Sequence, residues 1–335
     1  MILVVTPTPP DSPNGNGVTA RRWADILGDL GHRVDLVQGY QPGQPGDYDL
    51  LVALHAVKSA GAVRAFHADH PDAPVVIALT GTDLYPDLET TGVDRAVLAI
   101  ASRLVVLQPN GVEQVPPELR DRVRVIYQSM TAPVLPAAPD PDCFEVAFLA
   151  HLRPVKDPLL LAAAMRYLPT SSRIRVTHAG EARDPALASE AVAASQGSDR
   201  YHWVGALTRD DAMRVLARSR LLAVTSLHEG GANVVTEAIA LGVPVISSRI
   251  PGSTGLLGAG YPGYFRPGDP ADLARVLLAA EQDGEFYQSL RERCAELRDL
   301  ADPKRERSAW ASLLSELGLK QPGLKQPGLK QAGLK

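Results

Sequence analysis

The sequence has few of the features that mark membrane, secreted or disulfide-rich proteins. Across its 335 residues, no apolar run approaches the roughly 18 residues that cross a bilayer. The first residues, MILVVT, lack the basic stretch that opens a signal peptide and predict a strand instead. The two cysteines, Cys143 and Cys294, form no CxxC pair and are expected to be free thiols in a reducing compartment. We therefore expect a cytoplasmic protein that does not enter a membrane.

Lysine is scarce as well. Only seven of the 34 basic residues are lysine, and four of the seven lie in the last sixteen residues. Without those four, the formal charge falls from −4 to about −8. An acidic body disfavours binding to nucleic acid or to an anionic membrane surface. Any anion that this protein binds must be met by a local arrangement of donors.

Several catalytic motifs are also missing. The sequence lacks GxSxG, HExxH and GxxxxGK[ST], which disfavours hydrolase-elbow, zinc-protease and P-loop chemistry. Two DxD triplets, at 47–49 and 140–142, are of a kind that binds a divalent ion in some enzymes, but one lies at the start of a strand and the other lies in a linker. We expect no metal and no cofactor.

Short β-branched runs alternate with amphipathic helical stretches along most of the chain. Most of the runs are continuously apolar, as in parallel strands that are covered on both faces. The runs occupy 2–6, 33–37, 50–54, 75–79, 103–107 and 123–127, then 145–150, 174–180, 201–205, 221–226, 243–248 and 264–266. This pattern predicts an α/β fold with two Rossmann-like, doubly wound parallel-sheet domains. Ligands bind beyond the carboxyl ends of such strands, so we expect a cleft between the facing domains.

A proline-rich segment separates the two sets of strands and is typical of a linker. After the second set, one or two helices are expected, and they could cross back to the first domain. A GLKQP repeat follows, which cannot bury a face and predicts disorder. The predicted divisions are a first domain at 1–130, a linker at 131–143, a second domain at 144–272, C-terminal helices at 273–317 and a tail at 318–335.

A first candidate motif follows the first strand, where 15–20 (GNGVTA) matches GxGxxA. Dinucleotide binding is disfavoured for two reasons. Residues 7–15 form a long connection where that motif needs a tight turn, and the second strand does not end in the acidic residue that would bind the ribose. One alternative is a glycine-rich loop whose N–H groups, at a helix N-terminus, bind an anion. The other is a flexible loop without a ligand.

A second motif, R-x-x-K, directly follows the first strand of the second domain. Arg153 and Lys156 lie three residues apart on a strand-to-helix connection. This spacing allows a guanidinium and an ammonium to converge on a diphosphate. For so short a motif, a solvated surface pair is the alternative.

The third motif, at 226–245, runs from a strand end through a Gly-Gly turn into a helix. The turn leaves unpaired N–H groups at the start of the helix, which suit a phosphate. Glu229 and Glu237 are too far apart to share a proton, but they are placed to bind two hydroxyl-bearing parts of one ligand. Two unrelated surface glutamates are the alternative.

Together these residues resemble the family 4 nucleotide-sugar glycosyltransferases of the GT-B fold. The resemblance rests on E-x7-E at Glu229 and Glu237, on R-x-x-K and on the EAIALGVPVI continuation, over roughly 145–270. It implies that Arg153 and Lys156 hold a UDP diphosphate, that Glu237 binds the ribose and that Glu229 contacts the sugar. The implied donor-binding residues are Arg153, Lys156, Glu229, Gly230, Gly231, Ala232, Asn233 and Glu237.

Segments of the first half resemble a more specific group of proteins. TPTPPDSPNGNGVTARRWADIL, LHAVKSA, LTGTDLYPD and VIYQS, with the later IPGSTGLLGAGYPGYF, resemble the selenosugar synthases of selenoneine biosynthesis. The resemblance implies UDP-N-acetylglucosamine or UDP-glucose as donor, selenophosphate as acceptor and a 1-selenosugar as product. It also implies functional coupling to a selenophosphate synthetase and a selenoneine-forming oxygenase. The alternatives are a family 4 transferase with a hydroxyl or thiol acceptor, and a non-catalytic nucleotide-sugar-binding protein.

The chain departs from the family pattern at Thr80, where many members have a histidine that is often assigned to the reacting sugar. This departure fits an acceptor that is already an anion and needs no deprotonation. Lys58, the one lysine of the first domain, is assigned to selenophosphate, with a surface lysine as the alternative. The residues expected in catalysis are Lys58, His55, Thr80 and Asp83, and those expected to bind the acceptor are Gly15, Asn16, Gly17, Arg21, Thr82 and Gln128.

Overall fold

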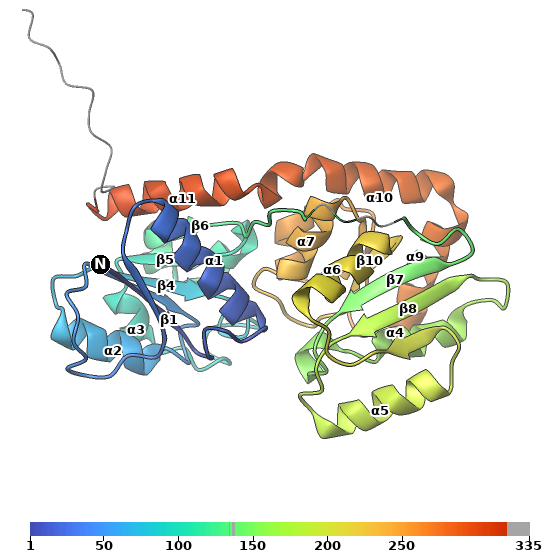
Figure 1. Cartoon of the computed structure of the whole chain (residues 1–335), viewed down its shortest axis with the longest axis horizontal. Coiled ribbons are helices and arrows are strands. Elements are labelled where there is room, and N and C mark those ends of the chain that lie inside the picture. Colours follow the sequence, from blue (N-terminus) through green and yellow to red (C-terminus); the bar gives the residue numbers. More distant parts are fainter. Residues whose placement is uncertain (134, 136–137, 320–335) are drawn as a thin grey trace, which may run out of the picture.

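Two six-stranded parallel sheets, one from each half of the chain, form the body of the protein (Figure 1). The computed structural model describes residues 1–133, 135 and 138–319. Each apolar run predicted as a strand overlaps one, and neighbouring strands pair in parallel throughout both sheets. The predicted α/β fold with two doubly wound sheets is therefore confirmed.

The strand order places a topological switch in each sheet. The first sheet has the order β2-β1-β3-β4-β5-β6, with β1 (Ile2–Thr6), β2 (Val34–Gln38), β3 (Leu50–Leu54), β4 (Val75–Leu79), β5 (Arg103–Val106) and β6 (Val123–Val125). The second has the order β12-β11-β10-β7-β8-β9, with β7 (Phe144–Leu149), β8 (Ile174–Ala179), β9 (Tyr201–Trp203), β10 (Leu221–Val224), β11 (Val245–Ser248) and β12 (Tyr264–Phe265). Successive connections leave β1 toward opposite edges of the first sheet, and the same holds at β7 in the second. The loops after β1, β3, β7 and β10 are therefore where a ligand is expected.

Helices connect the strands and cover both sheets. In the first half they are α1 (Gly15–Asp29), α2 (Ala60–Asp69) and α3 (Arg95–Ile100). In the second half they are α4 (Leu160–Ala164), α5 (Pro185–Gln196), α6 (Arg209–Arg218), α7 (Asn233–Leu241) and α8 (Pro251–Leu257). The segment predicted to hold one or two final helices contains three, namely α9 (Pro270–Gln282), α10 (Gly284–Glu296) and α11 (Pro303–Glu316).

The first sheet is buried on both faces. Along β1, Leu3 and Val5 belong to one hydrophobic cluster, whereas Ile2 and Val4 belong to another on the opposite face. Successive side chains of a strand point to opposite faces, so a strand with both faces covered must be apolar at every position. This explains why the predicted strands are continuous apolar runs rather than alternating ones.

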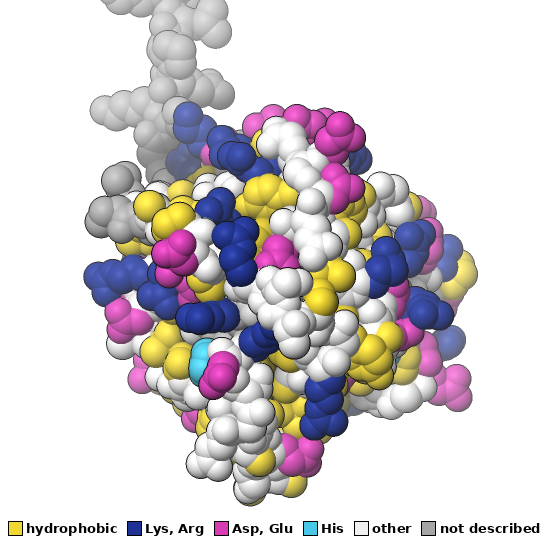
Figure 2. Space-filling model, turned by 90° about the vertical axis from the view of Figure 1, so that its right-hand side faces the viewer, with side chains coloured by type: hydrophobic (Ala, Val, Ile, Leu, Met, Phe, Trp, Pro, Cys, Tyr) yellow, Lys and Arg dark blue, Asp and Glu magenta, His cyan; other side chains and the backbone are white. Residues whose placement is uncertain are grey.

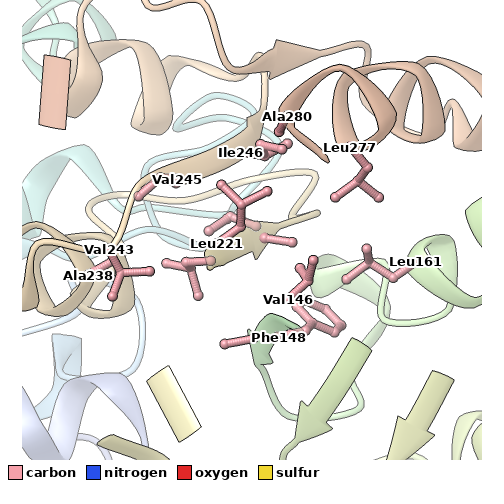
Figure 3. Close-up of a cluster of buried hydrophobic side chains, with 14 of the residues drawn as sticks. Val146, Phe148, Leu161, Leu221, Ala238, Val243, Val245, Ile246, Leu277 and Ala280 are labelled. Carbon is pink, nitrogen blue, oxygen red and sulfur yellow. The ribbon is translucent and has the colours of Figure 1, made fainter. Parts of the chain in front are cut away.

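The second sheet has its own core, in which strand side chains pack between helices (Figure 3). Val146 and Leu221 come from adjacent strands, Leu161 and Leu277 from α4 and α9, and Ala238 from α7. All five are almost completely inaccessible to solvent. The two sheets therefore have separate cores.

The C-terminal helix α11 returns to the first sheet and lies beside α1 (Figure 1). Trp310 of α11 meets Trp23 of α1 edge-to-face, with ring centroids 4.9 Å apart. Beside them lies the carboxylate of Glu306, which is 1% exposed. It accepts hydrogen bonds from Trp23 Nε1 at 2.7 Å, from Arg22 Nε at 2.9 Å and from the Ser129 amide at 2.8 Å. A charge buried at this position is compensated by one cation and by neutral donors.

The predicted linker, 131–143, contains neither helix nor strand among its described residues. Residues 134, 136 and 137 of the linker and 320–335 of the predicted tail lie outside the described residues, so the predicted disorder of the repeat is untested. The tail was predicted to begin at 318, but the amides of Gly318 and Leu319 still donate hydrogen bonds to carbonyls of the last turn of α11. The amide of Leu319 donates to the carbonyl of Leu314 at 3.0 Å.

The surface mixes charges of both signs. Figure 2 shows basic and acidic side chains interspersed over the end of the molecule formed by the second sheet and its helices. Many of the basic side chains are paired locally, such as Arg218 with Glu145 and Arg275 with Asp272. Among the described residues, none of the helices is both long and apolar enough to span a bilayer.

We predict that Glu306→Ala lowers the free energy of unfolding by about 3 kcal/mol or more, because it leaves Arg22, Trp23 Nε1 and the Ser129 amide without their acceptor. Glu292→Ala is the control, because Glu292 is an exposed glutamate of α10. Its effect should stay within about 0.5 kcal/mol. Denaturant titration of both variants tests the prediction, and equal effects would contradict it.

Candidate functional site

A cleft of about 1130 Å³ lies between the carboxyl ends of the two sheets. Its walls include the four loops at the topological switches, represented by Asn14 after β1, His55 after β3, Arg153 after β7 and Glu229 after β10. The fold thus places the predicted motifs of both halves on one cavity.

Fifteen of the eighteen predicted site residues line this cleft. On the side of the first sheet they are Gly15, Asn16, Arg21, His55, Lys58, Thr80, Thr82 and Gln128, and on the side of the second sheet Arg153, Lys156, Glu229, Gly231, Ala232, Asn233 and Glu237. The other three, Gly17, Asp83 and Gly230, lie behind the lining. Their predicted contacts with substrate are therefore not supported by their positions, and each has a packing role described below.

The predicted glycine-rich loop is the first turn of α1. Asn14 caps the helix, and its side-chain oxygen accepts from the amide of Gly17 at 3.0 Å. A Cβ on Gly17 would lie 2.4 Å from the carbonyl oxygen of Ser12, so only glycine lets the proline-rich loop fold back over the helix. Arg21 holds the same loop by donating to the carbonyls of Pro10 and Ser12. Its guanidinium therefore positions the loop as well as facing the cleft.

His55 directly follows β3 and has a strained conformation, with a φ of 71°. It is 4% exposed, and its Nε2 lies 3.1 Å from the Thr82 hydroxyl. Burial lowers the pKa of His55, and the positive charges of Lys58 and Arg153 act in the same direction, against the opposing effect of Asp83. A neutral imidazole is therefore expected at neutral pH.

Asp83 is fully buried behind His55. Its carboxylate accepts from the amides of Ala56, Thr80 and Gly81 at 2.8 to 2.9 Å. These bonds tie the loop after β3 to the loop after β4. Asp83 was predicted to act in catalysis, but its oxygens are occupied by backbone donors, so we describe it as a positioning residue.

On the opposite wall, the two charged motifs meet each other. Lys156 Nζ pairs with Glu229, and Ser226 Oγ donates to the same carboxylate at 2.6 Å. Ala232 provides no side-chain cap at the start of α7, so its first amides remain available to an anion. Among the described residues the side chain of Arg153 has no hydrogen-bonded partner, and Arg153 lines the cleft.

Glu237 lies in α7 and pairs with Arg209 at the start of α6, at 2.9 Å. Its side chain is only 9% exposed, although it borders the cleft. The two predicted glutamates are thus held by separate cationic partners, Lys156 for Glu229 and Arg209 for Glu237. This confirms only that they occupy distinct positions, and their roles stay predictions.

The walls of the cleft touch through glycines. A Cβ on Gly230 would lie 2.5 Å from the carbonyl oxygen of Thr80, and one on Gly231 would lie 2.6 Å from Leu107 Cβ. Gly230 was predicted to bind the donor; its Cα packs against the opposite wall, and its role toward the donor stays a prediction. Both positions require that no side chain separate the walls.

Asn233 makes a polar contact across the same boundary. Its Oδ1 accepts from Arg22 at 3.1 Å, and its Nδ2 donates to Thr19 at 3.3 Å. Gln128, whose Nε2 donates to Thr19 at 2.8 Å, extends this chain into the first sheet. Both Asn233 and Gln128 border the cleft.

The sequence analysis did not identify three residues of the site. Arg209, Arg22 and Asn110 make contacts in or beside the cleft, and Asn110 Nδ2 donates to Thr254 Oγ1 at 2.9 Å across the boundary. Arg209 follows the carboxyl end of β9, so the rule that located the other loops could have found it. Arg22 and Asn110 carry no comparable signal, because their partners are distant in sequence.

The described residues, 1–133, 135 and 138–319, contain no group of three or more His, Cys, Asp or Glu side chains arranged to hold a metal ion. The expectation of a metal-free reaction stays a prediction.

Comparison with known proteins shows what the fold and cleft resemble. Anabaena HepE in complex with UDP superimposes with a TM-score of 0.72, covering 94% of this chain and 99% of HepE at 18% identity. Sucrose-phosphate synthase from Thermosynechococcus elongatus gives 0.75, covering 95% and 98% at 16% identity. The chain therefore has the GT-B fold of glycosyltransferases.

The sequence of the second half is similar to a known family. Residues 137–296, just under half of the chain, match the model of glycosyl transferases group 1. D-inositol 3-phosphate glycosyltransferase of Mycobacterium sp. (strain KMS) is 34% identical over 118 residues, 34% of this chain and 26% of the relative. Glycosyltransferase 1 domain-containing protein 1 of Xenopus tropicalis is 30% identical over 110 residues, 32% of each chain. The chain thus matches about a third or less of the length of these curated relatives.

We predict that Gly230→Ala lowers the free energy of unfolding by about 1 to 3 kcal/mol, because the added methyl group collides with the Thr80 backbone. Gly61→Ala in α2 is the matched control, because nothing lies within 4 Å of its Cβ position. That substitution should be neutral or stabilising. Thermal or denaturant unfolding distinguishes the two, and an unchanged Gly230→Ala protein would refute the close contact.

Proposed function

We propose that this protein transfers a sugar from a UDP-sugar to selenophosphate and forms a carbon–selenium bond. The donor would be UDP-N-acetylglucosamine or UDP-glucose, as the resemblance to selenosugar synthases implies. HepE was solved in complex with UDP-glucose, which supports a UDP-sugar in the corresponding cleft. The group 1 family match of the second half supports sugar transfer as the reaction class.

The donor would bind on the side of the second sheet. Arg153, Lys156 and the uncapped start of α7 would meet the diphosphate, and Glu237 would bind the ribose. Negative charge grows on the distal phosphate as the anomeric bond breaks. Fixed cations and amide dipoles in a narrow cleft stabilise that charge without reorganising, so the protein's own groups would serve where other transferases use a metal ion.

The reaction balances with water as the only additional reactant. Selenium donates an electron pair to the anomeric carbon, and the bond from that carbon to the distal phosphate oxygen breaks, with its electrons leaving on UDP. The first product is a sugar linked through selenium to a phosphoryl group. Water then attacks phosphorus, the phosphorus–selenium bond breaks, and inorganic phosphate and the 1-selenosugar are released.

One observation favours an acceptor that is already an anion. Asp83 is buried and accepts from three backbone amides, its carboxylate lies 3.8 Å from His55 Nδ1, and burial lowers the pKa of His55. The pair therefore lacks the geometry of a carboxylate–histidine base that would activate a hydroxyl group. Lys58 and the hydroxyls of Thr80 and Thr82 line the same wall and suit an oxyanion. Selenophosphate needs no proton removed before it attacks.

In the cell, the proposed reaction would depend on a selenophosphate synthetase for its acceptor and would supply a selenoneine-forming oxygenase. A cytoplasmic location agrees with this role.

A panel of selenophosphate, hydroxyl and thiol acceptors tests this function. Purified protein with UDP-N-acetylglucosamine should release UDP when selenophosphate is the acceptor, and the rate of release should be the same in excess EDTA. Release with hydroxyl or thiol acceptors alone would instead indicate a conventional family 4 transferase. UDP-sugar binding without release in any arm of the panel would indicate a non-catalytic binding protein.

We predict that Arg153→Ala lowers kcat/KM for the UDP-sugar by about tenfold to a hundredfold, because the diphosphate loses a charged donor. Arg214→Ala is the control, because Arg214 is exposed on α6 and pairs with Asp211. Steady-state kinetics with varied UDP-sugar measure both variants. If the two variants have the same kcat/KM, Arg153 does not bind the donor.

A further inference from the structure

The histidine and carboxylate at the ends of β3 and β4 resemble a catalytic pair, but their geometry gives them another role. His55 Nδ1 lies 3.8 Å from Asp83, too far for a hydrogen bond. Instead, the backbone N–H of Lys58 donates to Nδ1 at 3.4 Å. In a neutral imidazole, a nitrogen that accepts carries no proton, so the proton lies on Nε2.

This protonation state determines how Thr82 can act. The Nε2–H of His55 donates to Thr82 Oγ1 at 3.1 Å. The hydroxyl of Thr82 accepts that bond, so its own proton points elsewhere. Thr82 is exposed on the cleft wall, and no second partner of its Oγ1 occurs among the described residues. Its O–H is therefore free to donate to a ligand oxygen.

The surroundings keep His55 in this state. The His55 amide donates to the carbonyl of Ala78. The amide of Ser59 donates to the carbonyl of His55, and the hydroxyl of Ser59 donates to the carbonyl of Leu54. These contacts hold a left-handed φ of 71° that a residue with a Cβ rarely adopts. The charged groups that face the ring are Asp83, Lys58 and Arg153, and with burial they give a net lowering of its pKa.

We propose that Thr82 donates its hydroxyl proton in a hydrogen bond to an oxygen of a tetrahedral oxyanion, and that His55 is the positioning residue that fixes this orientation. Lys58 supplies charge beside it, and Asp83 aligns the two loops. This inference rests on the proposed function, in which the oxyanion is the phosphoryl group of the acceptor. No proton is transferred to or from His55 in this role.

Inorganic sulfate is the probe, because it is a tetrahedral dianion that does not titrate between pH 5 and 8, and calorimetry measures its binding to the full chain. Thr82→Val removes the hydroxyl at an exposed position and should weaken sulfate binding about tenfold or more, whereas Thr82→Ser should bind like the wild type. Unchanged binding by Thr82→Val, or no sulfate binding by the wild type, would overturn the proposal.

Variants of His55 test the positioning role. His55→Gln retains an N–H near Nε2 and should keep most of the sulfate affinity, whereas His55→Ala should lose about as much as Thr82→Val. The double variant His55→Ala/Thr82→Val should be no weaker than Thr82→Val alone, because both remove the same interaction. Fully additive losses would overturn the coupling. Circular dichroism identifies variants that fail to fold, and the Thr82 pair then decides the donor role.

The pH dependence separates positioning from charge. With a neutral His55, sulfate affinity should be the same at pH 6 and pH 8. If the ring became a cation near its ordinary pKa, wild-type affinity would rise as the pH falls through about 6.5, and His55→Gln would abolish that rise. That result would overturn the proposal.

These experiments distinguish a failure of the Thr82 inference from a failure of the proposed function. Sulfate binding that depends on Thr82, without turnover of selenophosphate, would refute the selenium chemistry and leave the oxyanion site in place. Turnover of selenophosphate with an unchanged KM for this acceptor in Thr82→Val would refute the inference and leave the proposed function in place.

Discussion

The buried carboxylate of Glu306 connects the parts of the protein that must stay together for the cleft to exist. It lies on the last helix and accepts from Arg22 and Trp23 of α1 and from Ser129 after β6. A carboxylate without water is stable only with such compensation, so α11 must dock on the first sheet in one register. Arg22 also donates to Asn233 at the start of α7. One buried charge thus links the C-terminal helix to both walls of the cleft.

The spacing of those walls is set by residues that have no side chain. Gly230 and Gly231 bring the loop after β10 against Thr80 and Leu107, so the two halves meet at backbone distance. The remaining cavity presents cations and helix amides on one side and hydroxyl groups with Lys58 on the other. A substrate that fills this cavity displaces water, which strengthens the charge interactions inside and protects a reactive donor from hydrolysis.

Much of this arrangement follows from local sequence patterns. Continuous apolar runs specify buried parallel strands, and the switch-point rule then places Asn16, Lys58, Arg153 and Glu229 on one cleft. The pattern could not show that Asp83 accepts from three backbone amides, since this depends on how two loops meet. Nor could it identify the partners of Glu306, which are 177 to 284 residues away in the chain. Burial and pairing at such separations are consequences of tertiary packing.

The central claim is that the sugar acquires a bond to selenium in a cleft that needs no base. NMR of the product made from anomeric carbon-13 UDP-N-acetylglucosamine and selenium-77 selenophosphate tests it most directly. The account predicts a one-bond carbon–selenium coupling at the anomeric carbon, with one UDP released for each product. An anomeric carbon bonded to oxygen, with selenophosphate unconsumed, would contradict it.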